Sequence, residues 1–276
     1  MIMKTFENIL IASDIDGTIL WEHQFIHPRN LEKLRYFCDH GGRFTLSTGR
    51  NHIDIFRVTK DLEAYVNAPC ILCNGSYLYD KEKDEIINPK YLDHVRAVQL
   101  FTDVKDQFEG VGFRASFPNG FLCAEENPII LEQLRAWGLE KLATVRPLAA
   151  FSEEKLFKAA FVCDDADKLA RLQTYIAENY SDIFSVTTSG KTIMEVQPLG
   201  VSKKTQIMHL KQLYPNRTLW CIGDFNNDLE MLKGADVAVC PANAVDAVKE
   251  IAHIEVCHCK DGALADMIDE IEKSIA

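Results

Sequence analysis

The sequence lacks any apolar run long enough to span a bilayer, and none precedes the first expected strand. It also lacks internal repeats and low-complexity tracts. Positive charge is scarce, because 30 lysines and arginines stand against 41 acidic residues and leave a net charge of -11. Such an acidic chain argues against a nucleic-acid backbone or an anionic membrane as the main partner. We therefore expect a cytoplasmic protein that binds neither, and the sequence leaves its oligomeric state open.

The nine cysteines predict neither a disulfide framework nor a zinc site. Most lie in apolar runs, where reduced and buried thiols are expected. Cys70 and Cys73 have redox spacing but fall in an expected strand, which favours a structural role. Cys257-His258-Cys259 has no second cluster at the spacing that zinc sites need.

A pair of aspartates near the start of the chain is its most informative feature. Residues 9–12 form an apolar run that leads through Ser13 into Asp14-Ile15-Asp16-Gly17-Thr18. Two carboxylates two residues apart repel each other, so an arrangement of this kind needs a stabilising partner. A metal cation or proton transfer supplies it most easily. The pair therefore indicates a catalytic or metal-binding site.

The chain has 276 residues, enough for one large domain or two ordinary ones. Its two ends alternate expected strands and helices. Strands are expected at about 8–13, 43–47, 70–73, 218–222 and 237–239. Helices are expected at 27–40, from about 50 to 62, at 203–213 and at 228–233. This alternation predicts an α/β fold whose core is a doubly wound parallel sheet.

The pattern changes in the middle of the chain. Short strands are expected at 110–116, 155–163, 184–188 and 192–196, with helices at about 91–107 and 165–180. The sequence therefore predicts a core of residues 1–85 and 191–276, interrupted by an inserted α+β domain at 86–190. We expect this insertion to act as a lid that excludes water and supplies substrate contacts.

Polar residues follow four of the expected core strands. They are Asp14 with Asp16, Thr48, Asn74, and Asp224 with Asp228. Ligands of open parallel sheets bind beyond the carboxyl ends of the strands, so these side chains are expected at one edge. Helix capping also favours such residues in these turns, but it does not require so many acids. Arg50 and Asn74 are candidates for substrate contact because the same sheet aims them at this edge.

These residue types suit phosphoryl transfer. Asp14 would attack as nucleophile and form an aspartyl-phosphate, while Asp16 would serve as general acid and then as base. Mg²⁺ would offset the charge of the phosphoryl group, with Asp14 and Asp224 as ligands and Asp228 as an outer-shell partner or occasional ligand.

The phosphoryl oxygens need donors. Thr48 offers a hydroxyl and a backbone N–H at the expected start of a helix. A lysine would neutralise remaining charge, and position alone does not choose between Lys203 and Lys204.

In sequence order, these segments resemble the haloacid dehalogenase (HAD) superfamily, and within it the Cof-type phosphatases with a type IIB cap. The four motifs of that family match Asp14-Ile15-Asp16-Gly17-Thr18, Thr48-Gly49-Arg50, Val201-Ser202-Lys203 and the segment from Gly223 to Asp228. Asn74-Gly75, Pro241-Ala242-Asn243-Ala244 and Lys260-Asp261-Gly262 resemble further family segments. The resemblance runs from residue 9 to about residue 265.

The resemblance implies a Rossmann-like HAD core and a role for each matching residue. Asp14 is then the nucleophile, and Asp16 is the acid/base whose backbone carbonyl also reaches Mg²⁺. Asp224 completes the protein ligands of the metal. The same match selects Lys203 to hold the phosphoryl group with Thr48. Asn227 would support the phosphate or the metal shell.

The expected function is a Mg²⁺-dependent phosphatase of small phosphorylated metabolites, with sugar phosphates as the expected class. A phosphomutase of the same cap type is an alternative, but it would need cap groups that anchor a second phosphate. A non-catalytic phospho-ligand-binding protein is the other alternative. That alternative would lack at least one reacting residue, and none is missing. Four polar residues of the insertion are candidate leaving-group contacts, although solvated surface or strand pairing is the stronger explanation for each one: Arg114, Asn119, Lys155 and Lys158.

Overall fold

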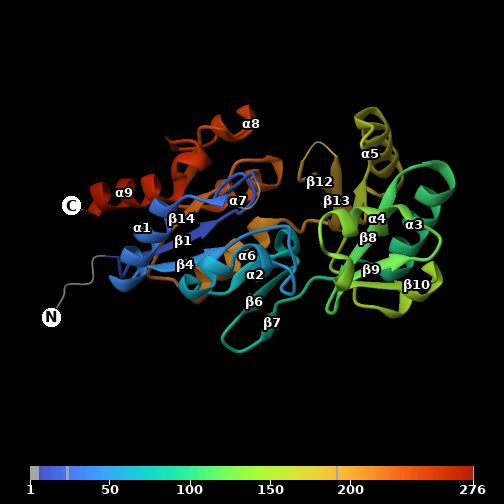
Figure 1. Ribbon diagram of the computed structural model, residues 1–276, viewed down its shortest axis with the longest axis horizontal. Coiled ribbons are helices and arrows are strands. Elements are labelled where there is room, and N and C mark those ends of the chain that lie inside the picture. The colour runs from blue at the N-terminus through green and yellow to red at the C-terminus, as the bar shows by residue number, and fades with distance from the viewer. Residues whose placement is uncertain (1–5, 23–24, 191, 276) are drawn as a thin grey trace. The chain divides into compact units, whose positions relative to one another are not determined.

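The computed structural model describes residues 6–22, 25–190 and 192–275 (Figure 1). The chain divides into two compact units: unit 1 is Met1–Ile87 with Ser202–Ala276, and unit 2 is Asn88–Val201. Most of the first seven residues, where the sequence predicts no apolar leader, lie outside the described residues. Within the described residues, no helix is both long and apolar enough to cross a membrane.

The second unit ends later than the sequence predicts. The expected boundary at 190/191 assigns β13 (Ile193–Pro198) to the core. In the structure β13 pairs with β11 (Lys158–Val162) and β12 (Phe184–Thr188), both of unit 2. A strand belongs to the sheet that completes its hydrogen bonds, so the core resumes only at Ser202.

Unit 1 is built on a parallel sheet of five strands. Their spatial order is β16 (Ile254–Val256), β15 (Val237–Pro241), β14 (Thr218–Ile222), β1 (Ile9–Ser13) and β4 (Arg43–Leu46). All neighbours in this order pair in parallel. Every residue of β1 is buried, as expected for a central strand covered on both faces.

Helices cover both faces of this sheet. They are α1 (Pro28–Asp39), α6 (Lys203–Leu213), α7 (Leu229–Gly234), α8 (Asp246–Lys249) and α9 (Ala263–Ile275). On one face Leu10 and Cys221 of the strands share a buried cluster with Ile207 of α6 and Met231 of α7. Side chains alternate along strands, so their neighbours face the other side, where α1 and α9 lie side by side (Figure 1). The predicted doubly wound α/β core is confirmed.

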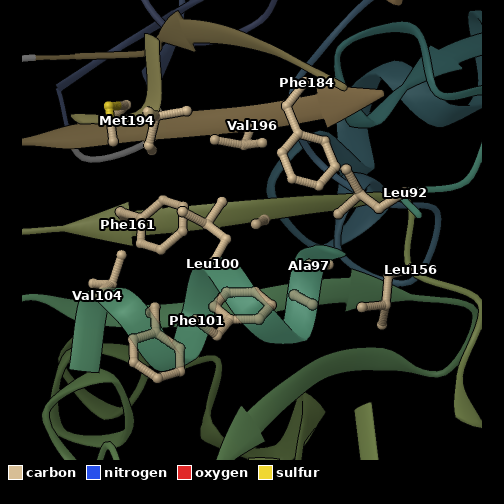
Figure 2. Close-up of a cluster of buried hydrophobic side chains, with 14 of the residues drawn as sticks. Leu92, Ala97, Leu100, Phe101, Val104, Leu156, Phe161, Phe184, Met194 and Val196 are labelled. Carbon is tan, nitrogen blue, oxygen red and sulfur yellow. The ribbon is translucent and has the colours of Figure 1, made fainter. Parts of the chain in front are cut away.

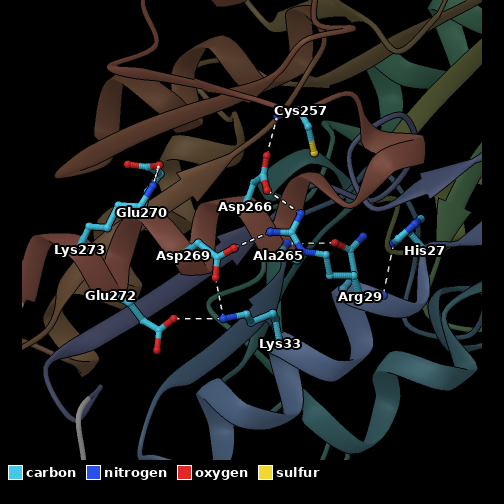
Figure 3. A network of polar contacts seen from close by, with 11 residues as sticks. His27, Arg29, Lys33, Cys257, Ala265, Asp266, Asp269, Glu270, Glu272 and Lys273 are labelled. Atoms are coloured by element: carbon cyan, nitrogen blue, oxygen red, sulfur yellow. Dashed lines mark hydrogen bonds and ion pairs between the residues drawn. The ribbon is translucent and has the colours of Figure 1, made fainter.

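An ion-pair network joins α1 to α9 (Figure 3). Arg29 contacts Asp266 at 2.6 Å and Asp269 at 2.5 Å, and Lys33 contacts Asp269 at 2.6 Å and Glu272 at 3.1 Å. These groups are partly exposed, so solvent screening keeps each pair weak. The network therefore fixes how α9 lies along α1 more than it stabilises the fold.

A small sheet continues unit 1 beyond β4. It contains β5 (Cys70–Leu72), β6 (Tyr77–Asp80) and β7 (Glu85–Ile87), and a parallel bridge from Ser47 to Ile71 joins it to the main sheet. A hairpin of β2 (Leu20–Trp21) and β3 (Phe25–Ile26) lies earlier in the chain.

The helix expected from about 50 to 62 is wrong in extent. The structure has only α2 (Ile55–Val58) and a 3-10 turn at Lys60–Tyr65. The Asn51 side chain accepts a hydrogen bond from the Asp54 N–H at 2.9 Å, and this local turn competes with helix formation.

Unit 2 is an α+β unit, as predicted. Its six-stranded sheet has the order β10 (Ala143–Arg146), β9 (Gly120–Ala124), β8 (Gly112–Phe117), β11, β13 and β12. Neighbouring strands are antiparallel except β9 and β10. Its helices are α3 (His94–Gln107), α4 (Ile129–Ala136) and α5 (Ala166–Tyr180). Figure 2 shows Leu100 and Phe101 of α3 directed at Phe161 of the sheet, within a buried apolar cluster.

The turn after β5 lies very close to the start of α6. Gly75 has a φ of +94°, and a Cβ built on it would lie 1.9 Å from the Ser202 carbonyl oxygen. The Gln206 side chain of α6 donates to the Gly75 carbonyl at 3.1 Å. Only glycine fits this approach, so Gly75 sets where α6 begins.

We expect Gly75→Ala to lower the free energy of unfolding by about 2–4 kcal/mol, because backbone strain and a steric clash add together. Gly138→Ala is the matched control, since Gly138 has a φ of +67° and no atom within 4 Å of a built Cβ. The control should lose only about 1 kcal/mol, the cost of strain alone. Urea unfolding of both variants measures the difference, and equal losses would contradict the close approach.

Candidate functional site

The site is built at the carboxyl ends of two neighbouring strands. Asp14 directly follows β1, and Asp224 follows β14 after one intervening residue, Gly223. The Asp14 N–H donates to the Ile222 carbonyl at 2.9 Å, which ties the two strand ends together. The core strand that follows β1 in the sequence, β4, pairs with one edge of β1, whereas β14 pairs with the other edge. Asp14 and Asp224 therefore sit at the switch point where open sheets bind ligands.

Lys203 is the buried centre of the site. Its ammonium contacts Asp14 Oδ1 and Asp228 Oδ1, each at 2.6 Å. The lysine side chain is 0% exposed, and so is that of Asp228. Lys203 is the first residue of α6, and this position points its side chain toward the strand ends. Position alone does not separate Lys203 from Lys204, and the family resemblance selects Lys203. Lys204 contacts Glu230 at 3.6 Å, and its side chain is 41% exposed.

Asp228 and Thr18 hold the loop that carries Asp224. Asp228 Oδ2 accepts the N–H groups of Asp224 at 3.0 Å and Phe225 at 3.1 Å. The Thr18 hydroxyl donates to Asp224 Oδ1 at 2.8 Å. A Cβ on Gly17 would lie 2.3 Å from Asp224 Oδ2, so glycine leaves room for that carboxylate. Both oxygens of Asp228 already accept hydrogen bonds, which suits a supporting role.

Burial and mutual repulsion dominate the electrostatics. Burial raises the pKa of Asp14 well above its ordinary value, and the carboxylates of Asp228 and Asp224 add to this against Lys203. Burial and Asp228 raise the pKa of Asp224 to about 7, although the Thr18 hydrogen bond opposes them. Burial would lower the pKa of Lys203, but Asp14 and Asp228 outweigh it and raise that pKa.

The acidic cluster fits a hard divalent cation. One side-chain oxygen from each of Asp14, Asp224 and Asp228 lies within 4.8 Å of the others. Three carboxylates share one ammonium, so two negative charges stay uncompensated when all are ionised. An all-oxygen donor set suits Mg²⁺, Ca²⁺ or Mn²⁺ better than soft metals. The side chain of Asp16 is not part of this group, and the expectation for Asp16 concerned its backbone carbonyl.

Asp16 faces Arg50 instead. Arg50 Nε and Nη2 donate to the two Asp16 oxygens at 3.0 and 2.8 Å. The Asp16 side chain is 56% exposed, in contrast to the buried Asp14. The two aspartates of the opening motif therefore have different surroundings. Asp14 contacts a buried lysine, whereas the exposed carboxylate of Asp16 pairs with the guanidinium of Arg50.

Among the other expected residues, the phosphate donor Asn227 meets the substrate candidate Asn74. Asn227 Nδ2 donates to Asn74 Oδ1 at 3.3 Å, so these two predicted residues meet. Asn74 has a φ of +54° and is buried. Thr48 is also buried, but its N–H donates to the Ile71 carbonyl at 2.9 Å and no helix begins there. The prediction that the Thr48 N–H donates to a phosphoryl oxygen is therefore wrong. The Thr48 hydroxyl is the donor that this residue can still offer.

Three of the four candidate cap residues contact partners within unit 2, and the fourth, Asn119, is exposed. Lys158 forms a buried ion pair with Glu195. The Arg114 guanidinium lies 4.0 Å from the centre of the Phe121 ring, and the Lys155 ammonium lies 5.7 Å from that of Tyr91. Strand pairing and packing thus account for much of what these side chains do.

Sequence reasoning missed three residues that support the site. Thr18 stands in the opening motif, where it was given no catalytic or binding role of its own, and its hydroxyl holds Asp224. Asn243 donates to the Gly17 carbonyl at 2.7 Å and accepts from the Cys259 N–H at 2.9 Å. Asn243 follows β15, so the rule that selected Asp14 and Asp224 would also have found it. Asp54 contacts Arg50 at 2.9 Å, and the i,i+4 spacing of these opposite charges was the signal that could have found the contact.

Similar chains among known proteins include phosphatases. A 5-amino-6-(5-phospho-D-ribitylamino)uracil phosphatase of Bacillus subtilis is 26% identical over 92% of each chain. A pyridoxal phosphate phosphatase of Escherichia coli is 24% identical over 94% of this chain and 97% of its own length.

Solved structures share the fold. A haloacid dehalogenase-like hydrolase from Bacteroides thetaiotaomicron superposes with a TM-score of 0.79 at 23% identity, covering 95% of this chain and 99% of its own. A HAD subclass IIB sugar phosphatase gives 0.80 at 16% identity over 97% and 100%. The family model of haloacid dehalogenase-like hydrolases matches residues 11–268, nearly the whole chain. The chain therefore belongs to the haloacid dehalogenase-like hydrolase family.

Proposed function

We propose that this protein is a Mg²⁺-dependent phosphatase that hydrolyses small phosphorylated metabolites through an aspartyl-phosphate on Asp14. The observation that carries the proposal is the buried contact of Lys203 with both Asp14 and Asp228, beside Asp224. A buried cluster with this excess of negative charge is costly for the fold. A cation and a phosphoryl group bound together would make use of all four groups.

Two half-reactions assign separate tasks to the two aspartates. Asp14 attacks phosphorus while the bond from phosphorus to the ester oxygen breaks, and Asp16 gives that oxygen its proton. Asp16, now a carboxylate, takes a proton from water, whose oxygen attacks phosphorus while the bond from phosphorus to Asp14 breaks. Inorganic phosphate leaves and the Asp14 carboxylate is restored. Lys203 holds the Asp14 carboxylate in place and offsets charge on the phosphoryl oxygens. The Thr48 hydroxyl and the Asn227 amide are the neutral donors to those oxygens.

Mg²⁺ is the proposed cofactor, and Asp14, Asp224 and the Asp16 backbone carbonyl would hold it. Bound there, it would neutralise charge that develops on the transferring group. Asp228 acts through the Asp224 backbone and Lys203, because both of its oxygens accept hydrogen bonds.

The proposed substrates are phosphate monoesters of small metabolites. Sugar phosphates remain the class that we expect. The two relatives named above add pyridoxal phosphate and 5-amino-6-(5-phospho-D-ribitylamino)uracil to the compounds worth testing. Release of inorganic phosphate from a panel of these esters identifies the substrate class.

Asp14→Asn should abolish phosphatase activity, lowering kcat by at least about 1,000-fold, because the nucleophile is lost. The variant should fold, since it removes one charge from a crowded and buried group. Phosphate release from p-nitrophenyl phosphate measures the effect. Asp106→Asn, which removes an exposed carboxylate from unit 2, is the control and should behave as wild type. Activity of Asp14→Asn at the wild-type rate would refute the assignment.

Without divalent cations, the free energy of unfolding should fall as the pH rises from about 4 to about 7. Asp224 has a pKa of about 7 in the fold against an ordinary value of 3.8. The folded protein thus keeps a proton that the unfolded chain has already released, and raising the pH favours unfolding. The slope for this one proton is at most about 1.4 kcal/mol per pH unit.

Urea unfolding with a chelator across this range measures the slope, and Asp224→Asn is the control that should reduce it. Adding Mg²⁺ at the alkaline end should restore both stability and activity. Chelation that leaves activity unchanged would contradict the metal requirement.

A further inference from the structure

A chain of three charged side chains leads from the proposed acid/base into the protein. Arg50 lies in the middle, with Nε and Nη2 on the two oxygens of Asp16 and Nη1 on Asp54 Oδ2 at 2.9 Å. The exposed fraction of the side chain falls from 56% for Asp16 to 24% for Arg50 and 3% for Asp54. The outer carboxylate is accessible, whereas the inner one is enclosed by protein.

Asp54 has no other evident task in the described part of the chain. It precedes α2, but its side chain makes no capping hydrogen bond to that helix. Its Oδ1 atom is buried and has no hydrogen-bond partner. A buried carboxylate with one unsatisfied oxygen destabilises a fold, so a compensating use is expected. Arg50 is the charged group that it contacts.

The geometry fixes the orientation of Asp16. A guanidinium that meets a carboxylate through two parallel N–H bonds sets both its position and its plane. Arg50 is long and flexible, and alone it would hold an exposed carboxylate only loosely. The remaining guanidinium nitrogen, Nη1, donates to Asp54, which lies four residues further along the same segment. Cys73 N–H also donates to the Arg50 carbonyl at 2.9 Å, which fixes the backbone end of this arginine.

We propose that Asp54 is a positioning residue for proton transfer, which holds Arg50 so that Arg50 orients the Asp16 carboxylate. The inference rests on the proposed function, in which Asp16 protonates the ester oxygen as its bond to phosphorus breaks. Asp54 touches neither substrate nor metal in this scheme. Its effect therefore depends on how much each substrate needs a proton from Asp16.

Leaving groups supply the test. An alkyl phosphate needs its departing oxygen protonated, whereas p-nitrophenolate leaves readily without a proton. Asp54→Asn should lower kcat/KM for an alkyl ester such as β-glycerol phosphate by about tenfold, part of the usual contribution of general acid catalysis. It should change kcat/KM for p-nitrophenyl phosphate by less than about threefold, because that ester needs little acid catalysis. Asp61→Asn, an exposed aspartate in the following 3-10 turn, is the matched control and should change neither value.

A double-mutant cycle isolates the path through Asp16. In an Asp16→Asn background the residual hydrolysis of the alkyl ester should be insensitive to Asp54→Asn, since the group that Asp54 orients is already gone. Arg50→Lys keeps the charge but loses the paired N–H geometry, so it should reproduce the same leaving-group dependence. That variant also tests the link if Asp54→Asn does not fold.

Equal losses on both esters would overturn the inference, because a general structural defect does not distinguish leaving groups. Additive effects in the double-mutant cycle, or an unchanged or faster Asp54→Asn enzyme, would overturn it as well. Wild-type protein that releases no phosphate from any ester would instead refute the proposed function, and the inference with it. The two failures are thus distinguishable from the wild-type assay alone.

Discussion

The contact of one buried ammonium with two carboxylates is the interaction on which the site depends. Lys203 begins α6, Asp14 directly follows β1 and Asp228 lies in the loop after β14, so three separate segments meet at one nitrogen. Without that positive charge, three enclosed carboxylates would repel each other at close range. Gly75 and Gly17 serve the same arrangement, because they leave space for the start of α6 and for Asp224.

The core and its acidic residues could be predicted because they depend on local pattern. Apolar runs that end in Asp14 and Asp224 mark parallel strands and their ligand-binding ends directly. The segment 50–62 could not, since the Asn51 turn opposes helix formation through a contact that hydrophobic periodicity does not report. The contact of Arg50 with Asp16 was missed because it joins residues 34 positions apart and depends on side-chain directions in the fold.

Stability and activity make opposing demands at this site. The raised pKa values of Asp14 and Asp224 mean that the fold alone favours their neutral forms. Nucleophilic attack and metal ligation both need them ionised. The empty site therefore destabilises the fold through repulsion among its carboxylates. Binding of a cation would relieve this repulsion, which the rest of unit 1 must otherwise offset. The apolar clusters on the sheet supply that offset.

The order in which the chain is synthesised also matters. Unit 2 is one continuous segment, whereas unit 1 is closed by pairing β1 with β14, which joins Ile9 to Thr218. During translation the central strand of the core emerges long before its neighbour, and unit 2 is complete in the interval. A nascent chain thus carries a finished second unit while its first is still open. Lys203, Asp224 and Asp228 all arrive afterwards, so assembly of the acidic cluster is one of the last events of folding.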